Sequence, residues 1–368
     1  MSEHARRSAN FPNGDDMTSP RVLRFMAALA LCNAGSALAQ TCTHPPEWPT
    51  PFQIILPLQG TITVGADVPV GAEIYTATHN SGSDANIRCT GGPGRIQREE
   101  AYMGSPGEPS GLPGIYKTSI PGVGVAMWYA GAKFPRNPGD YTVGADPTRI
   151  IFSKLVDFSL YKIGPISAGV LQGSSLPRAR QSTLGAGNIN IWESQIVGQL
   201  NIVTGTCRVG DVNVRMGAIP QSTFNGIGSF AAWQRYEVPL TDCPAFFGRM
   251  AAYARDDSGT VERAGRRVAN RIGVRLDPST EILDQARSIM ALQPGTPGNP
   301  AARGIGIQVA WDDESPVGFR AFRDSGLPLT TTANGSYRIP LRARYYQVED
   351  RVRGGPANGA MVMTLRYE

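Results

Sequence analysis

The residue types that perform most enzyme chemistry are sparse in this chain of 368 residues. It has three histidines, and two of them, His44 and His79, lie in the region that we expect to fold. The sequence has no G-x-S-x-G elbow, no Walker loop and no H-E-x-x-H motif. The adjacent carboxylates Asp312 and Asp313 would point to opposite faces of a strand, which does not suit an acid–base pair. The sequence therefore predicts a protein that is not an enzyme and has no cofactor or metal.

The cysteines indicate a structural role instead of a catalytic one. Four of the five lie in the region that we expect to fold: Cys42, Cys89, Cys207 and Cys243. In an exported protein, an early pair and a late pair suggest two local disulfides, Cys42–Cys89 and Cys207–Cys243, one in each half of the chain. A four-cysteine metal site is the alternative, but no C-x-x-C pair is present.

The amino-terminal residues have the features of an export signal. From Met17 the chain has two arginines, then an apolar run over residues 25–32, then an A-x-A motif that ends at Ala39. The apolar run is too short to span a bilayer. We therefore expect residues 1–39 to be a signal peptide with an extension upstream of Met17, and the exported chain to begin near Gln40. The small basic excess of the remainder predicts no nucleic-acid partner.

The elements that would position any site are short β-strands. The chain contains 43 glycines and 29 prolines, which disfavour long helices and favour turns. Up to about Leu200 the apolar runs are FQIILPL, ITVGADV, AEIYTAT, GVGVAMWY, RIIFSKLVDFSLYKI and INIWESQIV. From about Asn201 they are VNVRMGAI, RYEVPL, RIGVRL, GIGIQVAW, YRIPLRARYYQV and the terminal GAMVMTLRY. Short strands separated by turn formers predict an all-β chain of sandwiches.

Two segments do not follow the alternating pattern. Residues 280–292, TEILDQARSIMAL, fit an amphipathic helix and equally fit two strands joined by a turn. The segment Ala245–Ala269 is rich in charges and shows little alternation, which predicts a solvated loop or hairpin.

The carboxy-terminal part resembles the pilin domain of the chaperone–usher fimbrial family. The resemblance runs from Cys207 through VNVRMGAI, YEVPLTDC, RIGVRLDP, GIGIQVAW and IPLRARYYQ, and covers about residues 200–368. Gly355 is fourteenth from the end and Tyr367 is penultimate, as in the last strand of that family. The charged segment after Cys243 is longer than usual, and methionines occupy strand positions where β-branched residues or phenylalanine are common.

The resemblance implies an incomplete immunoglobulin-like sandwich whose missing strand is supplied by another chain. A periplasmic chaperone would fill the groove first, and the amino-terminal extension of an adjacent fimbrial subunit would replace it at the outer-membrane usher. The residues expected to line the groove and contact the chaperone are Gly355, Met361, Met363, Leu365 and Tyr367.

The amino-terminal half resembles, more loosely, the receptor-binding domains of two-domain fimbrial adhesins such as the type 1 tip adhesin. The best match is YKTSIPGVGVAMW, residues 116–128. Only Gln40 and Thr41 precede Cys42, which is too short an extension to donate a strand. The resemblance thus implies a receptor-binding domain over 40–199, a pilin domain over 200–368, and export through the periplasm to the fimbrial tip. A structural tip or minor subunit that starts or caps assembly without binding a receptor is the alternative.

Tip adhesins of this kind usually bind glycans, and a glycan site needs an aromatic face beside amide or carboxylate groups. Two stretches of the amino-terminal half provide these groups. The candidate glycan-binding residues are Trp128, Tyr129, Asn137 and Asp140 in the first stretch and Asn80 and Asp84 in the second.

Overall fold

The computed structural model describes residues 40–368 except 80–84, 145–147, 153–154, 186 and 251–266. The predicted export segment, residues 1–39, lies outside the described residues. Two short 3-10 turns, η1 (Gly173–Ser175) and η2 (Gln221–Thr223), are the helical elements of the described part, which contains no α-helix. Nothing in that part is a helix long and apolar enough to cross a membrane. All other regular structure there is β, so the predicted all-β class is confirmed.

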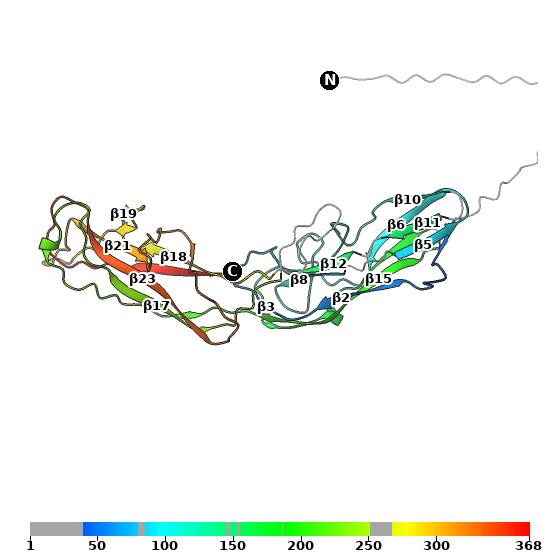
Figure 1. The fold of residues 1–368 in the computed structure, drawn as a ribbon, viewed down its shortest axis with the longest axis horizontal. Helices are drawn as coiled ribbons and strands as arrows, with labels where there is room; N and C mark the ends of the chain where they lie inside the picture. The colour runs from blue at the N-terminus through cyan, green and yellow to red at the C-terminus, as the bar shows by residue number, and fades with distance from the viewer. Residues whose placement is uncertain (1–39, 80–84, 145–147, 153–154, 186, 251–266) are drawn as a thin grey trace, which may run out of the picture. The chain divides into compact units, whose positions relative to one another are not determined.

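Three sheets build the amino-terminal sandwich around one core (Figure 1). The smallest contains β1 (Thr41–Thr43), β5 (Ala85–Thr90) and β11 (Thr148–Phe152). The largest has the order β10 (Asp140–Val143), β6 (Gly94–Tyr102), β14 (Ala179–Leu184), β15 (Asn190–Val203) and β13 (Gly169–Gln172), and both β2 (Phe52–Leu58) and β3 (Thr61–Thr63) pair with β15. The third has the order β4 (Glu73–His79), β12 (Val156–Lys162), β8 (Val123–Tyr129) and β7 (Tyr116–Lys117), with β9 (Ala132–Lys133) beside β8.

The strand pattern of this sandwich follows the apolar alternation of the sequence. In β2, the inward residues Ile54, Leu56 and Leu58 are buried while the residues between them are exposed. In β12, by contrast, all of Val156–Lys162 is buried, because neighbouring strands flank it and side chains cover both faces. Its outer face belongs to a small second cluster in which Tyr161 packs with Ile115 and Ala126.

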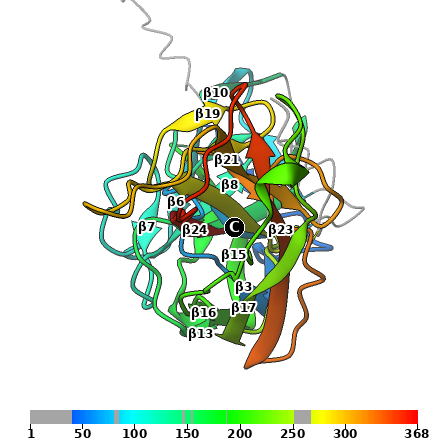
Figure 2. The same cartoon turned by 90° about the vertical axis from the view of Figure 1, so that its left-hand side faces the viewer.

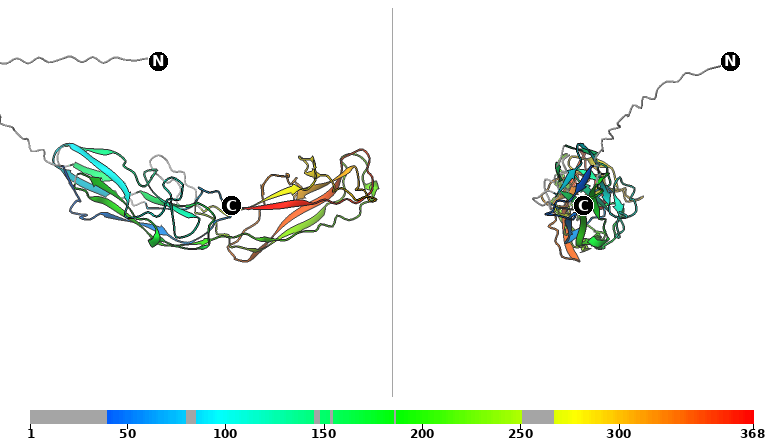
Figure 3. Two further views of the ribbon diagram at one scale, coloured as in Figure 1. Left: turned by 180° about the vertical axis from the view of Figure 1, so that it is seen from behind. Right: turned by 90° about the vertical axis from the view of Figure 1, so that its right-hand side faces the viewer.

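Two sheets build the carboxy-terminal sandwich around a separate core. The larger has the order β16 (Arg208–Val209), β17 (Gln234–Cys243), β23 (Gly335–Gln347), β21 (Ile305–Trp311), β20 (Ile289–Met290) and β19 (Ile282–Asp284). The smaller has the order β22 (Arg323–Asp324), β18 (Ile272–Pro278) and β24 (Met361–Tyr367). Figure 2 shows β17 and β23 side by side, and Figure 3 shows β24 in red, ending at the carboxy terminus.

The structure decides between the two readings of residues 280–292 and corrects one predicted strand. β19 and β20 pair in antiparallel fashion across a turn, so the segment is a strand pair and not a helix.

The run VNVRMGAI, residues 212–219, forms no strand. Its apolar side chains Met216 and Ile219 pack on the core only in part. A strand needs a neighbour for its backbone groups, and no ladder partner for this run occurs in the described part of the chain.

Both predicted disulfides are confirmed. The structure joins Cys42 to Cys89 and Cys207 to Cys243. The first links the paired strands β1 and β5, and the second ties the start of the carboxy-terminal sandwich to the end of β17. The division between residues 199 and 200 stays a prediction, and β15 itself continues to Val203.

The charged segment after Cys243 begins and ends as a hairpin. Arg249 and Val268 exchange backbone hydrogen bonds of 2.9 and 2.8 Å, and residues 251–266 between them lie outside the described residues. Met250 pairs with Tyr75 of β4: its N–H donates to the Ile74 carbonyl and its own carbonyl accepts from the Thr76 N–H. The hairpin thus extends the edge of the sheet that contains β4.

Candidate functional site

The terminal strand β24 presents an open edge. It pairs with β18 in antiparallel register, from Tyr367 opposite Ile272 to Met361 opposite Pro278. Along its other edge, no strand is paired with it within the described residues. Its alternate side chains Met361, Met363 and Leu365 are only half-buried, although they pack on the core. A strand edge with unpaired backbone groups and half-covered apolar side chains is a site for strand addition.

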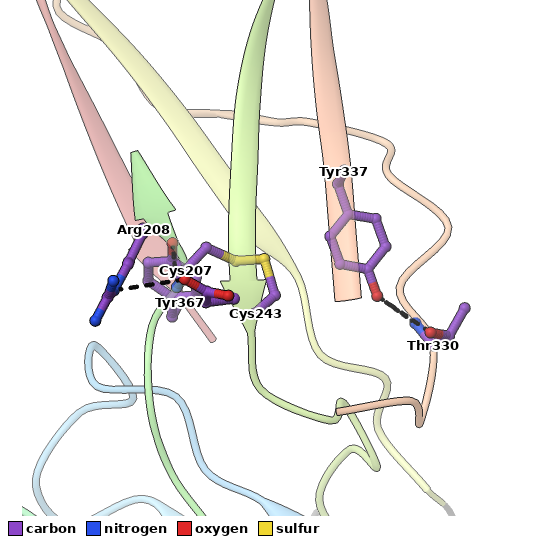
Figure 4. Close-up of a disulfide and its surroundings, with 7 residues drawn as sticks. Cys207, Arg208, Cys243, Thr330, Tyr337 and Tyr367 are labelled. Carbon is purple, nitrogen blue, oxygen red and sulfur yellow. Dashed lines mark hydrogen bonds and ion pairs between the residues drawn. A yellow bond between two sulfur atoms is a disulfide. The ribbon is translucent and has the colours of Figure 1, made fainter. Parts of the chain in front are cut away.

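The carboxyl end of β24 is fixed by its penultimate residue. Tyr367 is buried, and its hydroxyl accepts a hydrogen bond of 3.1 Å from the backbone N–H of Cys207, beside the Cys207–Cys243 disulfide (Figure 4). Burial raises the pKa of the Tyr367 hydroxyl, while the hydrogen bond from Cys207 acts in the opposite direction. The Tyr367 N–H also donates to the Asp67 carboxylate at 2.8 Å. One end of the strand is therefore anchored while its edge stays open.

Gly355 lies against a neighbouring segment where no side chain fits. A Cβ at this position would come within 2.5 Å of the Pro300 carbonyl oxygen and 2.7 Å of the Ala302 nitrogen. A hydrogen bond from the Ala302 N–H to the Pro356 carbonyl holds the two segments together. Gly355 thus permits the close approach of the chain that leads into β24.

We expect Gly355→Val to destabilise the carboxy-terminal sandwich by about 1–3 kcal/mol, because the backbone around residues 300–302 must move to admit the side chain. Gly354→Val is the matched control, since a Cβ there meets no atom within 4 Å. Urea unfolding of the two variants measures the difference, and equal stabilities would contradict the role assigned to Gly355.

A hollow of about 490 Å³ lies beside Trp128 on the amino-terminal sandwich. Its lining includes Tyr116 of β7, Trp128 of β8 and Lys133 of β9; this surface is called the Trp128 hollow below. Trp128 and Lys133 are cross-strand partners. The Lys133 ammonium lies 5.1 Å from the Trp128 ring centroid and donates to the Pro113 carbonyl at 3.0 Å. An aromatic face beside a cation and hydrogen-bonding groups can hold a polyhydroxylated ligand.

Three other candidate glycan-binding residues, Tyr129, Asn137 and Asp140, do not line the hollow. Tyr129 faces the core, where its ring lies 5.6 Å from that of Trp192 and burial raises its pKa to about 12. Asn137 and Asp140 are exposed, and Asp140 is 3.8 Å from Arg95. Asn80 and Asp84 lie outside the described residues. Of the four candidates that the structure describes, only Trp128 lines the hollow.

Sequence reasoning missed two residues of the hollow, Tyr116 and Lys133. Lys133 could have been found, because the turn formed by Ala130 and Gly131 brings it opposite Trp128. No sequence pattern near Tyr116 indicated that it would line the hollow, since its position beside β8 depends on the path of residues 117–122.

An ion pair between a buried carboxylate and a partly exposed arginine supports the loop that follows the hollow. Glu100 is fully buried and accepts hydrogen bonds from the Arg136 guanidinium and from the Gln181 amide at 3.0 Å. Trp192 donates to the same Gln181 side chain at 3.0 Å, and Arg136 also donates to the Tyr129 carbonyl at 3.0 Å. Burial raises the pKa of Glu100, and the hydrogen bond and charge of Arg136 counteract that shift. The network fixes the segment that carries Asn137 to the end of β8.

Comparison with known proteins places these features in context. No protein-family model matches the chain. A fimbria adhesin protein of Klebsiella pneumoniae is 24% identical over 313 residues, which are 84% of this chain and 89% of that relative. The chain resembles a fimbrial adhesin. The resemblance to fimbrial adhesins predicted from the sequence is confirmed. That relative is named for adhesion, a binding activity, which agrees with the prediction that the chain is not an enzyme.

Solved structures show a more distant similarity to this adhesin-like chain. The CupB6 tip adhesin of Pseudomonas aeruginosa matches with a TM-score of 0.34 and 13% identity, over 89% of this chain and 94% of that one. The receptor-binding domain of the adhesin MrkD1P of Klebsiella pneumoniae matches with a TM-score of 0.32 and 18% identity, over 46% of this chain and 98% of that one.

Proposed function

We propose that the protein is the tip subunit of a chaperone–usher fimbria, which attaches the cell to a host or environmental glycan. In this proposal the exported chain passes through the periplasm with a chaperone on β24 and reaches the usher. An adjacent subunit then supplies a strand to the same edge. The half covering residues 200–368 joins the fibre, and the half covering 40–199 binds the receptor.

The observation that carries this proposal is the open edge of β24. An apolar edge strand in a soluble protein invites aggregation unless another strand covers it. Met361, Met363 and Leu365 are half-buried on that edge, and the run VNVRMGAI offers no strand to close it. Gly355 lets the segment that leads into β24 pack closely against its neighbour, and Tyr367 fixes the carboxyl end of β24, so that a donated strand meets a fixed template.

The receptor part of the proposal is supported by the Trp128 hollow. A saccharide could stack its C–H face on Trp128 while Lys133 and nearby backbone carbonyls engage its hydroxyl groups. The hollow is lined by Tyr116 as well, which adds a second aromatic side chain. Asn137 and Asp140 are exposed and stay candidates for contact with a longer glycan.

A glycan-array screen of the mature protein tests the receptor part. We expect selective binding, and we expect Trp128→Ala to weaken it by about tenfold or more, as removal of a central aromatic contact does. Trp48→Ala is the matched control, because Trp48 is 43% exposed and does not line the hollow. Tyr116→Ala is a second variant in case Trp128→Ala lowers the melting temperature. Absence of any glycan binding by folded protein would favour the alternative, a structural tip or minor subunit that caps or starts assembly.

A further inference from the structure

A second hollow lies on the outer face of the amino-terminal sandwich, where β15 changes partners. β15 pairs with β2 from Trp192 to Gly198 and then continues along β13 and β3. At the change, Gly198 has a positive φ of 102°, and a Cβ there would come within 2.3 Å of the Leu58 carbonyl oxygen. β15 can change its pairing partners at this point only because residue 198 has no side chain.

The turn η1 contributes Gly173 and Ser174 to the lining of this hollow. Gly173 lies so close to β15 that a Cβ would come within 2.8 Å of the Ile196 carbonyl oxygen. The hollow between them has a volume of about 560 Å³. We call it the Gln195 hollow. Buried Ile196 and Leu176 contribute to its lining, and Val197, which is 48% exposed, adds apolar surface.

The polar lining of the Gln195 hollow is dominated by amides. Gln172, Gln195 and Gln199 line it together with Ser174 and Arg178, and no carboxylate-bearing residue of the described chain does. The Gln172 amide donates to the Gln199 side-chain oxygen at 3.2 Å, which orients both groups. An amide has two donor hydrogens and an acceptor oxygen, so each of these side chains keeps further donor and acceptor capacity.

These groups suit one class of ligand. A sugar hydroxyl donates and accepts at once, and an amide can engage two neighbouring hydroxyls in the same way. The apolar side chains beside the amides match the C–H groups of a pyranose ring. A cation would need carboxylates, which the lining lacks, and the guanidinium of Arg178 is already 3.6 Å from Glu193, which disfavours a strongly anionic ligand.

We propose that the Gln195 hollow is a second saccharide site, which takes a neutral sugar through its amides without aromatic stacking. The inference rests on the proposed glycan-binding function and extends it from one site to two. The two sites differ in chemistry, because the Trp128 hollow combines aromatic rings with an ammonium group, whereas the Gln195 hollow offers amides and aliphatic side chains.

The test uses the mature protein on an array of neutral oligosaccharides and their sialylated counterparts, followed by calorimetric titration of the neutral oligosaccharides that bind. We expect Trp128→Ala to leave residual binding of neutral oligosaccharides. Adding Gln195→Leu and Gln199→Leu to that variant is expected to raise the dissociation constant by roughly tenfold or more, since two hydrogen bonds are lost. Gln53→Leu is the matched control, because Gln53 is exposed on the neighbouring β2 and lies outside the hollow.

Several outcomes would overturn the second site. Loss of all binding in Trp128→Ala, at an unchanged melting temperature, would overturn it and leave the proposed function intact. Residual binding that the two glutamine substitutions do not alter, or that is restricted to sialylated glycans, would also overturn it. If the wild-type protein binds no saccharide on the array, both the second site and the proposed glycan-binding function fail. Should the combined variant unfold, Gln172→Leu in the Trp128→Ala background provides the same comparison.

Discussion

A peptide that occupies the open edge of β24 is expected to raise the melting temperature of the protein. At a free concentration one hundred times its dissociation constant, a ligand of the folded state adds about 2.7 kcal/mol, which corresponds to roughly 5–11 °C for a domain of this size. The physical reason is that the added strand pairs the free backbone groups of β24 and covers Met361, Met363 and Leu365. Synthetic peptides that copy the amino-terminal extensions of fimbrial subunits, screened by differential scanning fluorimetry, make the measurement.

Two matched variants separate strand addition from nonspecific binding. Leu365→Lys places a charge on the half-buried side of β24, so the peptide should no longer stabilise that variant. Val362→Lys changes a residue that is 61% exposed on the same strand, and its response should match that of the wild type. A peptide with its apolar residues moved out of register should have no effect, because a shift of one residue reverses the faces of a strand. Equal shifts from matched and shifted peptides would contradict strand addition.

Replacement of Arg136 by methionine is expected to destabilise the amino-terminal sandwich by about 3–5 kcal/mol, because the substitution leaves the Glu100 carboxylate buried without its cationic partner. Glu100 is fully buried, and Gln181 alone would remain to donate to it. Arg180→Met is the matched control. The Arg180–Glu99 pair, at 3.0 Å, is partly exposed at both ends, and its loss should cost no more than about 1 kcal/mol. Urea unfolding followed by tryptophan fluorescence reports both values.

The cost of Arg136→Met should also depend on pH. Burial raises the pKa of Glu100 above that of the unfolded chain, and removal of Arg136 raises it further, since Arg136 lowers this pKa. Between the ordinary and the raised pKa, the folded protein binds more protons than the unfolded chain, so its stability falls as the pH rises. The loss of stability caused by Arg136→Met is therefore smallest when the pH is below the ordinary pKa of glutamate, and it reaches its full value when the pH is above the raised pKa of Glu100. An equal cost at about pH 4 and about pH 8 would show that Glu100 is not the group left unpaired.

Alternation in the sequence predicted most strands, and the one predicted strand that does not form has a physical cause. The run GIGIQVAW became β21, with Val309 fully buried between two neighbouring strands. The run VNVRMGAI has a comparable pattern but forms no strand, because a strand also requires a neighbour, and local sequence does not reveal whether one exists.

The candidate site was harder to predict because it depends on pairs of residues distant in sequence. Strand geometry alone could have separated Trp128 from Tyr129, since neighbours on a strand face opposite ways. The pair formed by Glu100 and Arg136 joins residues 36 positions apart, and no pattern in either segment indicates the partner. The disulfides were predictable because cysteine, unlike glutamate or glutamine, has few roles in an exported chain.

The hairpin that begins at Arg249 bears on how this molecule responds to mechanical load. Only Thr204–Thr206 lies between the end of β15 and Cys207, so these three residues would form the tether if the sandwiches were pulled apart. Met250 is bonded to Ile74 and Thr76, and Tyr367 is bonded to Asp67. These bonds act in parallel with the tether and must break before it can extend. Under the proposed function, tension between a receptor and the fibre would thus be shared by several hydrogen bonds and not carried by one segment of covalent chain.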